Sequence, residues 1–363
     1  GSERLAVDPA DPDHVLFGSS RQGLWQSLDG GDHWVRVADE QVPAGQFPDT
    51  AVDQVGVGAV AFADGAMFAG VNGSGIYMSI DGGVGWQSIR SLDAGQYAAG
   101  AVAADGGMWV GLHRSDGGAA EVAVYDVATA EWADIALPFS SYFVAFAVDP
   151  ADPERVVVAD EAVRDQHFWT STDGGRRWRR HDVAIISPDV PWLSQTDLDG
   201  FMSTGRLQFD PSDGTLWFAE GMGVWRTTNL AAATITWEAA AQGIEETVAS
   251  AIVVPPGAAP LGAVADRQGF RFDDWTRYPV APLIDDRFAG GTSIDFSGGS
   301  PNVVAWVGAE YHIYYSPDRR PRGALSTDGG ATWQEFGGMT PEMFGGEIAI
   351  SATDPATLVW LPT

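Results

Sequence analysis

One eight-residue pattern occurs four times in this chain and constrains its fold more than any other feature. Each copy reads Ser-x-Asp-Gly-Gly-x-x-Trp, and the copies occupy residues 27–34, 79–86, 171–178 and 326–333. The Asp carboxylate can accept backbone N–H bonds within its own turn, and the paired glycines can adopt positive φ without a Cβ clash. The Trp supplies an apolar plug beneath the turn. We therefore expect a tight turn between two strands at each copy, in a chain built of repeats.

The spacing of this pattern, which is known as the Asp-box, predicts the size of the repeat. Consecutive copies are separated by one, about two and about three units of roughly 50 residues, a length within the range of propeller repeats. Degenerate copies fit the gaps at residues 126–132, 229–237 and 273–275. The chain is therefore expected to contain about seven units.

Alternating apolar residues on either side of Asp-Pro turns predict the strands of each unit. Residues 5–18 and 146–159 read as strand, turn and strand, and a loop, a third strand, the Asp-box turn and a last strand follow. Four strands per unit are typical of a β-propeller blade. No segment has a sustained helical period, so we expect an all-β propeller of four-stranded Asp-box repeats. A further hairpin at 348–361 has no Asp-box after it, so we expect the chain to end within a blade.

Charge and composition narrow the classes of partner. The net charge is −29 and all 20 basic residues are Arg, a balance that opposes binding to nucleic acid or to an anionic membrane. A neutral polysaccharide remains compatible. The absence of Cys excludes thiol catalysis and a disulfide scaffold, and it fits a secreted bacterial protein. The six His are scattered without the spacing of a metal site. We expect a monomer with no metal and no cofactor.

The loop between the second and third strands of each unit is the best candidate for function, because in propellers such loops gather at one end of the body. Aligning the units on the strand after this loop places Ser20, Asn72, Glu220 and Asp266 at one position. Hydrolysis of a glycosidic bond needs two carboxylates, one to donate a proton and one to activate water or attack the sugar. Glu220 and Asp266 are therefore candidate catalytic residues, and turn residues are the alternative reading.

Trp192 is the best candidate for a surface on which a sugar ring could stack. It lies in a long Pro-rich and acidic loop, residues 187–205, whereas most other Trp belong to Asp-boxes or strands. The alternative reading is that Trp192 packs the loop against the body of the protein.

Residues 243–275 read GIEETVASAIVVPPGAAPLGAVADRQGFRFDDW. This segment resembles the glycoside hydrolase family 74 xyloglucanases, which carry G-[LM]-E-E-T-A-V, then S-P-P-S-G-A-P-L, then G-D-[ILV]-G-G-F-x-H-D-D-L. Family-like stretches at 4–12, 191–193 and 326–333 occur in the same order, so the resemblance covers essentially the whole chain. The 243–275 segment is the specific one, because Asp-boxes are shared with sialidases and sortilin-like receptors.

The resemblance implies a fold of two seven-bladed propellers and a reaction. The family cleaves β-1,4-glucan backbones that bear xylose branches, with inversion, in an open cleft between its propellers. Its general acid corresponds to Asp266, and in the same segment Arg267 and Asp274 are predicted substrate contacts. Residues 1–250 would form most of a first propeller, without its first blade segment, and 251–363 the opening blades of a second.

The family's general base lies in an R-T-D-I-G-G-A-Y-R-W segment that precedes the stretch matching residues 4–12, and this chain does not contain it. We therefore expect a partial chain that lacks hydrolase activity alone, with Glu220 as the in-chain substitute base. Around the predicted acid, Arg267 and Gln268 replace an aliphatic residue and a Gly, and Phe272 replaces a His. An Arg beside the acid would lower the pKa of that carboxyl and oppose a general-acid role if the two side chains meet.

Two functional readings follow from these observations. The first is a secreted glycoside hydrolase of the endo-acting xyloglucanase type, with a polysaccharide as its partner. The alternative is a non-catalytic Asp-box propeller that binds carbohydrate or protein. An R-T-D-x-G-G segment upstream of residue 1 in the gene would favour the first reading.

Overall fold

The computed structural model describes residues 4–45, 56–104, 106–142, 144–160, 167–194, 205–245, 247–265, 267–284, 289–310, 321–336, 339–340, 343 and 345–362. Within these ranges the chain is almost entirely β-structure, and its one helix is the single turn α1 (Pro191–Ser194). The prediction of an all-β chain with very little helix is confirmed. None of the described helical structure is long and apolar enough to cross a membrane.

Five antiparallel groups of four strands make up the first two thirds of the chain, and we call them blades 1 to 5. Within each blade the four strands pair in chain order, and blades 4 and 5 are joined into one eight-stranded sheet by pairing of their last strands, β16 and β20. Their bounds are as follows: β1 (Leu5–Val7), β2 (Val15–Ser19), β3 (Gly23–Ser27) and β4 (Val35–Arg36) in blade 1; β5 (Val57–Ala63), β6 (Ala66–Val71), β7 (Gly75–Ser79) and β8 (Gln87–Ser91) in blade 2; β9 (Gln96–Ala104), β10 (Gly107–Arg114), β11 (Glu121–Asp126) and β12 (Glu131–Ile135) in blade 3; β13 (Val144–Asp149), β14 (Asp152–Asp160), β15 (Phe168–Thr172) and β16 (Arg179–Ile186) in blade 4; β17 (Leu207–Phe209), β18 (Leu216–Glu220), β19 (Gly223–Thr227) and β20 (Thr234–Ala239) in blade 5.

Three smaller groups follow. Blade 6 has three described strands, blade 7 has four, and a final hairpin has two. Their bounds are β21 (Ala249–Val253), β22 (Leu261–Val264) and β23 (Arg267–Arg271) in blade 6; β24 (Ala289–Ser297), β25 (Ser300–Glu310), β26 (Pro321–Ser326) and β27 (Gln334–Glu335) in blade 7; and β28 (Glu347–Ile350) and β29 (Leu358–Leu361) in the hairpin. The predicted four-stranded repeats and the extra hairpin are therefore present.

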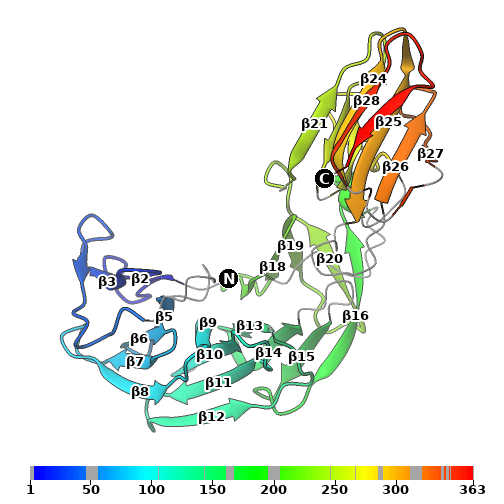
Figure 1. The fold of residues 1–363 in the computed structure, drawn as a ribbon. Helices are drawn as coiled ribbons and strands as arrows, with labels where there is room; N and C mark the ends of the chain where they lie inside the picture. The colour runs from blue at the N-terminus through cyan, green and yellow to red at the C-terminus, as the bar shows by residue number, and fades with distance from the viewer. Residues whose placement is uncertain are drawn as a thin grey trace. The chain divides into compact units, whose positions relative to one another are not determined.

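The chain divides into two compact units. The first consists of Gly1–Ala184, Asp199–Gly221 and Trp225–Trp237, and the second of Ile185–Leu198, Met222–Val224 and Glu238–Thr363. The first unit holds blades 1 to 5 apart from the ends of β16, β19 and β20, and the second holds blades 6 and 7. In Figure 1 the blades of the first unit follow one another in chain order, from the blue β2 and β3 to the green β14 and β15.

The Asp-box turns have the predicted geometry and lie between the third and fourth strands of their blades. In all four copies the Ser Oγ donates to the Asp Oδ1 at 2.8–2.9 Å and accepts the N–H of the second Gly at 2.8–3.0 Å. The Asp Oδ1 also accepts the N–H four residues further on at 2.8–2.9 Å. Both glycines of every copy have positive φ, as a side chain at those positions would be strained.

The Trp residues of the Asp-box turns have two kinds of partner. Trp178 Nε1 donates to the carbonyl of Ala136 at 2.8 Å, and Trp132, in the degenerate copy, donates to Ile89 at 3.1 Å, so both bond to the end of the preceding blade. Trp333 Nε1 instead donates to the carbonyl of Gly330 in its own turn at 3.1 Å. The ring of Trp34 contacts that of Phe17 in its own blade, with centroids 6.1 Å apart.

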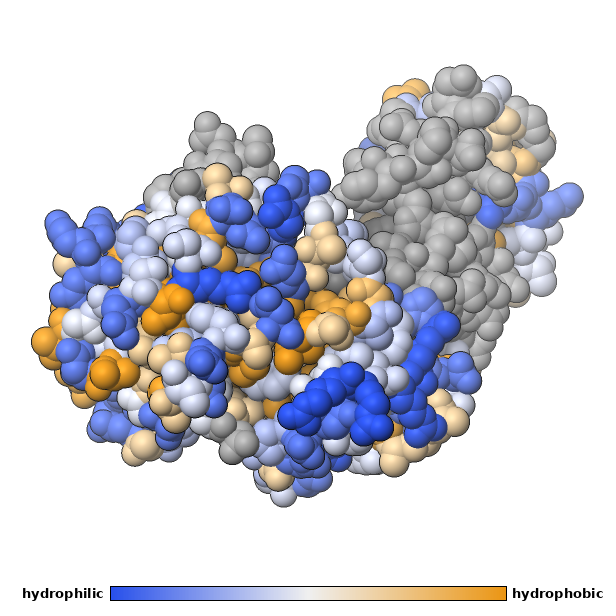
Figure 2. Space-filling model, turned by 90° about the horizontal axis from the view of Figure 1, so that it is seen from below, coloured by the Kyte–Doolittle hydropathy of each residue, from blue (hydrophilic) through white to orange (hydrophobic). Residues whose placement is uncertain are grey.

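The core consists of the layers between successive blades. Leu16 and Leu24 of blade 1 pack with Val60 and Met67 of blade 2, and blades 2 and 3 and blades 3 and 4 meet in the same way. Burial of an aliphatic or aromatic side chain contributes about 1.5–3 kcal/mol, so these layers hold the blades together. On the face in Figure 2, apolar residues in orange lie singly or in small groups among polar residues in blue, as on most folded proteins.

Candidate functional site

The second strands of the blades end on one face of the first unit, which we call the loop face. Antiparallel pairing places the end of each second strand beside the start of the first strand, as with His113 opposite Tyr97 and Asp160 opposite Val144. Asn72 and Glu220 occupy the corresponding ends of β6 and β18. The loop face therefore holds the position that the sequence alignment singled out.

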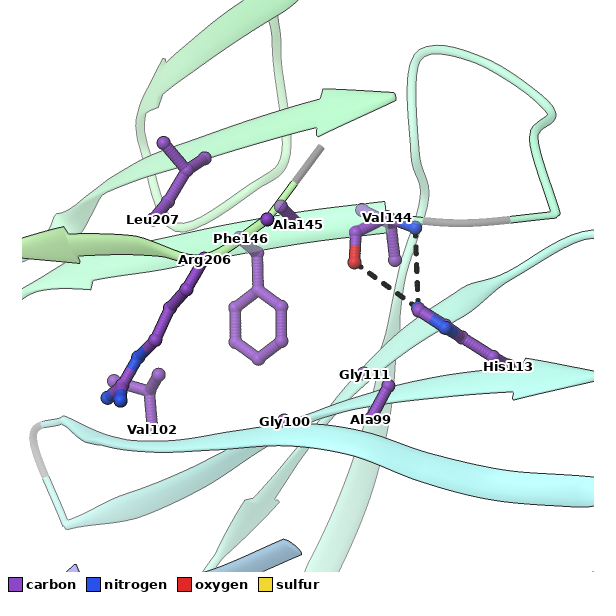
Figure 3. A pocket seen from close by; sticks show the side chains of 11 residues that line it. Ala99, Gly100, Val102, Gly111, His113, Val144, Ala145, Phe146, Arg206 and Leu207 are labelled. Atoms are coloured by element: carbon purple, nitrogen blue, oxygen red, sulfur yellow. Dashed lines mark hydrogen bonds between the residues drawn. The ribbon is translucent and has the colours of Figure 1, made fainter. Parts of the chain in front are cut away.

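A channel of about 400 Å³ runs between the first strands of blades 1 to 5. Its walls are mainly apolar, and the polar side chains at its lining are Arg206 and Gln208. At the loop face the channel is continued by a small cavity of about 30 Å³ between blades 3, 4 and 5. Figure 3 shows this cavity, with Gly100, Gly111 and Phe146 around it and Arg206 on its rim.

His113 is the titratable group of this cavity, and it acts as a packing residue. It is 1% exposed, and Nε2 lies 3.3 Å from the amide nitrogen and 3.2 Å from the carbonyl oxygen of Val144, as drawn in Figure 3. Burial lowers its pKa to about 4, because a low-dielectric site disfavours the charged form. The ring is therefore neutral near pH 7, and Nε2 can accept the Val144 N–H to link β10 to β13. A base that accepts a backbone N–H in this way is not placed for catalysis.

A carboxylate–imidazole pair lies on the loop face of blade 4. Asp160 ends β14, and its Oδ1 accepts the backbone N–H of His167 at 2.8 Å, while Oδ2 lies 3.1 Å from His167 Nδ1. The side chains are 12% and 18% exposed. The sequence alignment missed Asp160 because it was made on the third strand, which begins at Phe168 in this blade, eight residues after Asp160, whereas β19 begins three residues after Glu220. Alignment on the second strand, VVVAD against LWFAE, would have placed Asp160 opposite Glu220.

Glu220 lies at the predicted end of a second strand and is half-buried. Its Oε1 accepts a hydrogen bond from Trp225 Nε1 at 3.1 Å, and Trp225 is fully buried in β19. The carboxylate is therefore held in place by a rigid neighbour. Whether it serves as a substitute base stays a prediction.

Asp266, the predicted general acid, lies outside the described residues. The strands on either side of it are present as expected, β22 before it and β23 after it. Arg267 begins β23 and is only 5% exposed, and Gln268 is 2% exposed. This burial is unfavourable for a contact between Arg267 and a polymer in solvent, and the predicted substrate contact stays a prediction.

Trp192 has the packing role that the sequence left open as its alternative, and the substrate contact of Asp274 stays a prediction. Trp192 is 2% exposed and packs against Phe270 with ring centroids 5.1 Å apart, so it has no open face for a sugar. Asp274 follows the last residue of β23, whereas Asp266 precedes its first residue. Its Oδ1 accepts the N–H and hydroxyl of Thr276 at 2.8 and 2.7 Å, and these bonds lower the pKa of Asp274. In the structure Trp192 packs in the interior, and Asp274 stabilises a turn.

Comparison with known proteins gives a consistent picture. No family model matches the chain. It is 28% identical to a xyloglucanase of Acetivibrio thermocellus over 99% of this chain and 49% of that protein, and 28% identical to a probable oligoxyloglucan-reducing end-specific xyloglucanase of Neosartorya fischeri over 92% of this chain and 50% of that protein. The chain thus spans about half the length of these curated relatives.

A solved structure extends the likeness to the fold. The crystal structure of a family 74 xyloglucanase from Xanthomonas campestris superposes with a TM-score of 0.83 at 28% identity, over 99% of this chain and 55% of that one. The described strands, their pairing and the Asp-box turns agree with this propeller architecture. In sequence and in fold, essentially the whole of this chain is therefore similar to xyloglucanases of glycoside hydrolase family 74.

Proposed function

We propose that the protein is a glycoside hydrolase that acts on the β-1,4-glucan backbone of a xyloglucan-type polysaccharide. The observation that carries this proposal is the likeness to xyloglucanases over 99% of the chain, in sequence and in fold together. The segment 243–275, which surrounds Asp266, supports it further. The net charge of −29 is compatible with a neutral substrate and unfavourable for a polyanion.

The proposed reaction is an inverting hydrolysis. Asp266 gives its proton to the glycosidic oxygen as the bond from that oxygen to the anomeric carbon breaks. A second carboxylate takes a proton from water, whose oxygen forms the new bond to the anomeric carbon from the opposite face. The two carboxyl groups of such a pair lie about 6.5–9.5 Å apart to admit the water.

The location of Asp266 in the chain suits the role of a reacting group. It lies between β22 and β23, so a strand supports it on each side, and groups on rigid elements are positioned more accurately than groups on long loops. We also propose that the protein is secreted. A plant cell-wall polymer is outside the cell, and the absence of Cys fits a secreted bacterial protein.

The test is turnover of xyloglucan by the full-length gene product and by its Asp266→Asn variant. We expect the variant to lose measurable cleavage while oligosaccharide binding remains, because the amide keeps the shape and has no proton to donate. Asp274→Asn is the matched control, since Asp274 lies in a turn at the other end of β23, and it should retain activity. Near-wild-type turnover by Asp266→Asn would rule out its assignment as the acid.

A non-catalytic polysaccharide-binding propeller is the second candidate, and the burial of Arg267 favours it. A buried cation next to Asp266 in the chain would favour the ionised carboxylate if the two side chains meet, and an ionised group has no proton to give. This reading predicts that the full-length wild-type protein binds xyloglucan oligosaccharides and releases no reducing ends. Turnover by the full-length wild-type protein would exclude it.

A further inference from the structure

Trp275 is the most exposed of the 15 Trp residues in the chain. It is 65% exposed, whereas Trp34 is 36% exposed and the others are partly or fully buried. It lies in the turn after β23, at the degenerate Asp-box copy of blade 6. A large apolar ring in contact with solvent suits a ligand when the ring is rigid and when polar groups lie beside it.

The ring of Trp275 is held flat by Phe272. The two ring centroids are 4.8 Å apart and the planes differ by 9°, so one face of the indole lies on Phe272. An exposure of 65% leaves the other face in contact with solvent. Phe272 in turn contacts Phe270, which is 5% exposed, so the pair is anchored to the interior of blade 6. Phe272 and Trp275 replace the His and the Leu of the motif that residues 243–275 resemble, so the stacked pair is a departure of this chain from that motif.

Hydrogen bonds fix the turn that carries the ring. Asp274 Oδ1 accepts the N–H and the hydroxyl of Thr276 at 2.8 and 2.7 Å. The carbonyl of Asp274 accepts the N–H of Arg277 at 3.2 Å. Both the ring of Trp275 and its backbone are therefore supported. Binding to such a preorganised surface costs less conformational entropy than binding to a mobile one.

Charged side chains flank Trp275 in this turn. The Asp273 side chain is 69% exposed and lies 2.9 Å from Arg271, and the Arg277 side chain is 84% exposed, with its Nε 3.7 Å from Asp274 Oδ2. Covering these charges with another protein surface would carry a desolvation cost. The hydroxyl groups of a neutral sugar can instead donate to the carboxylate and accept from the guanidinium. The surroundings of the ring therefore favour a sugar over an apolar protein surface.

We propose that Trp275 is a stacking platform for a neutral β-glucan chain, with Asp273 and Arg277 as contacts for its hydroxyl groups. A β-1,4-linked glucose ring has apolar C–H groups on its faces and hydroxyl groups at its edge, which match an aromatic surface with polar groups beside it. The inference rests on the proposed function and extends it by naming a second sugar-binding site.

The platform lies at the end of β23 away from the predicted acid. Asp266 precedes the first residue of β23, and Trp275 follows the last residue by four positions. A strand rises about 3.3 Å per residue, so β23 alone spans roughly 16 Å. The platform therefore holds the polymer at a distance from the bond that is cleaved.

Oxidation of Trp residues by N-bromosuccinimide in the full-length gene product tests the platform, with each oxidised residue identified by peptide mass spectrometry. Without sugar, we expect Trp275 to be oxidised faster than Trp34, because its ring is more exposed. A saturating xyloglucan oligosaccharide that the protein does not cleave should slow the oxidation of Trp275 severalfold. The oxidation of Trp34, the internal control, should not change.

The oligosaccharide concentration that protects half of Trp275 measures the affinity of this site alone. Arg277→Ala removes hydrogen-bond donors and leaves the ring in place, so we expect this concentration to rise about three- to tenfold. Val280→Ala is the matched control, because Val280 is 70% exposed in the same segment and has no polar group to offer. It should give the wild-type value. A wild-type value for Arg277→Ala would contradict the proposed hydroxyl contacts.

Two results would overturn the platform and leave the proposed function standing. In the first, xyloglucan is cleaved but Trp275 is unreactive without sugar, which shows that protein covers the ring. In the second, the protein cleaves xyloglucan and binds the oligosaccharide while Trp275 is oxidised at the same rate with and without it. If the full-length protein neither binds nor cleaves xyloglucan, the proposed function fails and the platform fails with it.

Discussion

The tripeptide Arg-Gln-Gly occurs at the same loop of two blades and has opposite environments in them. In blade 1, Arg21 and Gln22 are exposed in a turn, where both of their N–H groups lie within reach of Ser19 Oγ at 3.2 and 3.0 Å. In blade 6, Arg267 and Gln268 belong to β23 and are 5% and 2% exposed.

The difference between these two loops comes from where the third strand begins. In blade 1 the strand starts at the glycine, Gly23, whereas in blade 6 it starts two residues earlier, at Arg267. The earlier start brings Arg267 and Gln268 between the sheets, where Gln268 O accepts the Trp306 Nε1 hydrogen bond at 2.7 Å. Identical local sequence therefore has different burial, because neighbouring sheets decide how far a strand extends.

The largest difference in stability should be between alanine variants of the two glycines. Gly269 has φ +135°, and a Cβ there would lie 1.9 Å from the carbonyl oxygen of Gly262, whereas Gly23 has φ +76° and meets the flexible end of Arg36 at 3.3 Å. We expect Gly269→Ala to lower the free energy of unfolding by about 3 kcal/mol and Gly23→Ala by about 1 kcal/mol. Urea denaturation measures both, and equal losses would show that β23 can move to admit a side chain.

The second largest difference in stability should be between alanine variants of the two arginines. Arg267→Ala removes a long buried side chain and leaves a cavity between the sheets, so we expect a loss of about 3 kcal/mol. Arg21→Ala removes an exposed side chain, and its effect should lie within about 0.5 kcal/mol of zero. The pair of melting curves sharpens the comparison, and a neutral Arg267→Ala would mean that its burial contributes nothing to stability.

Low pH should destabilise the Asp-box turn of blade 1, which lies at the end of the third strand away from the Arg-Gln-Gly loop. In blade 1, hydrogen bonds from the backbone and ring of His33 and from Ser27 lower the pKa of Asp29 to about 2. A lowered folded-state pKa stabilises the fold above the unfolded value of about 3.9, and this stabilisation is lost as pH falls towards 2. Asp29→Asn should therefore flatten the dependence of melting temperature on pH between about 4 and 2. An unchanged slope would show that Asp29 titrates normally.

Much of the fold could be predicted because it depends on short-range chemistry. The degenerate turn at 229–237 is an example, since Thr227 Oγ1 donates to Asn229 Oδ1 at 2.8 Å and Thr236 N donates to the same oxygen at 3.0 Å, as Ser and Asp do in the full pattern. The candidate site was less predictable. The sequence left Trp192 open between a sugar platform and loop packing, and the structure shows it buried. Asp160 was missed because the next strand begins eight residues after it, at Phe168.

The sequence by itself determined the turns, the four-stranded repeat and the all-β propeller class, because each depends on hydrogen bonds within a few residues or on strand periodicity. Only the tertiary structure decided that Arg267 is buried, that Trp178 bonds to the preceding blade, and that His113 joins β10 to β13. These features depend on contacts between residues tens of positions apart. The energy of such contacts comes from burial between sheets, which no local pattern encodes.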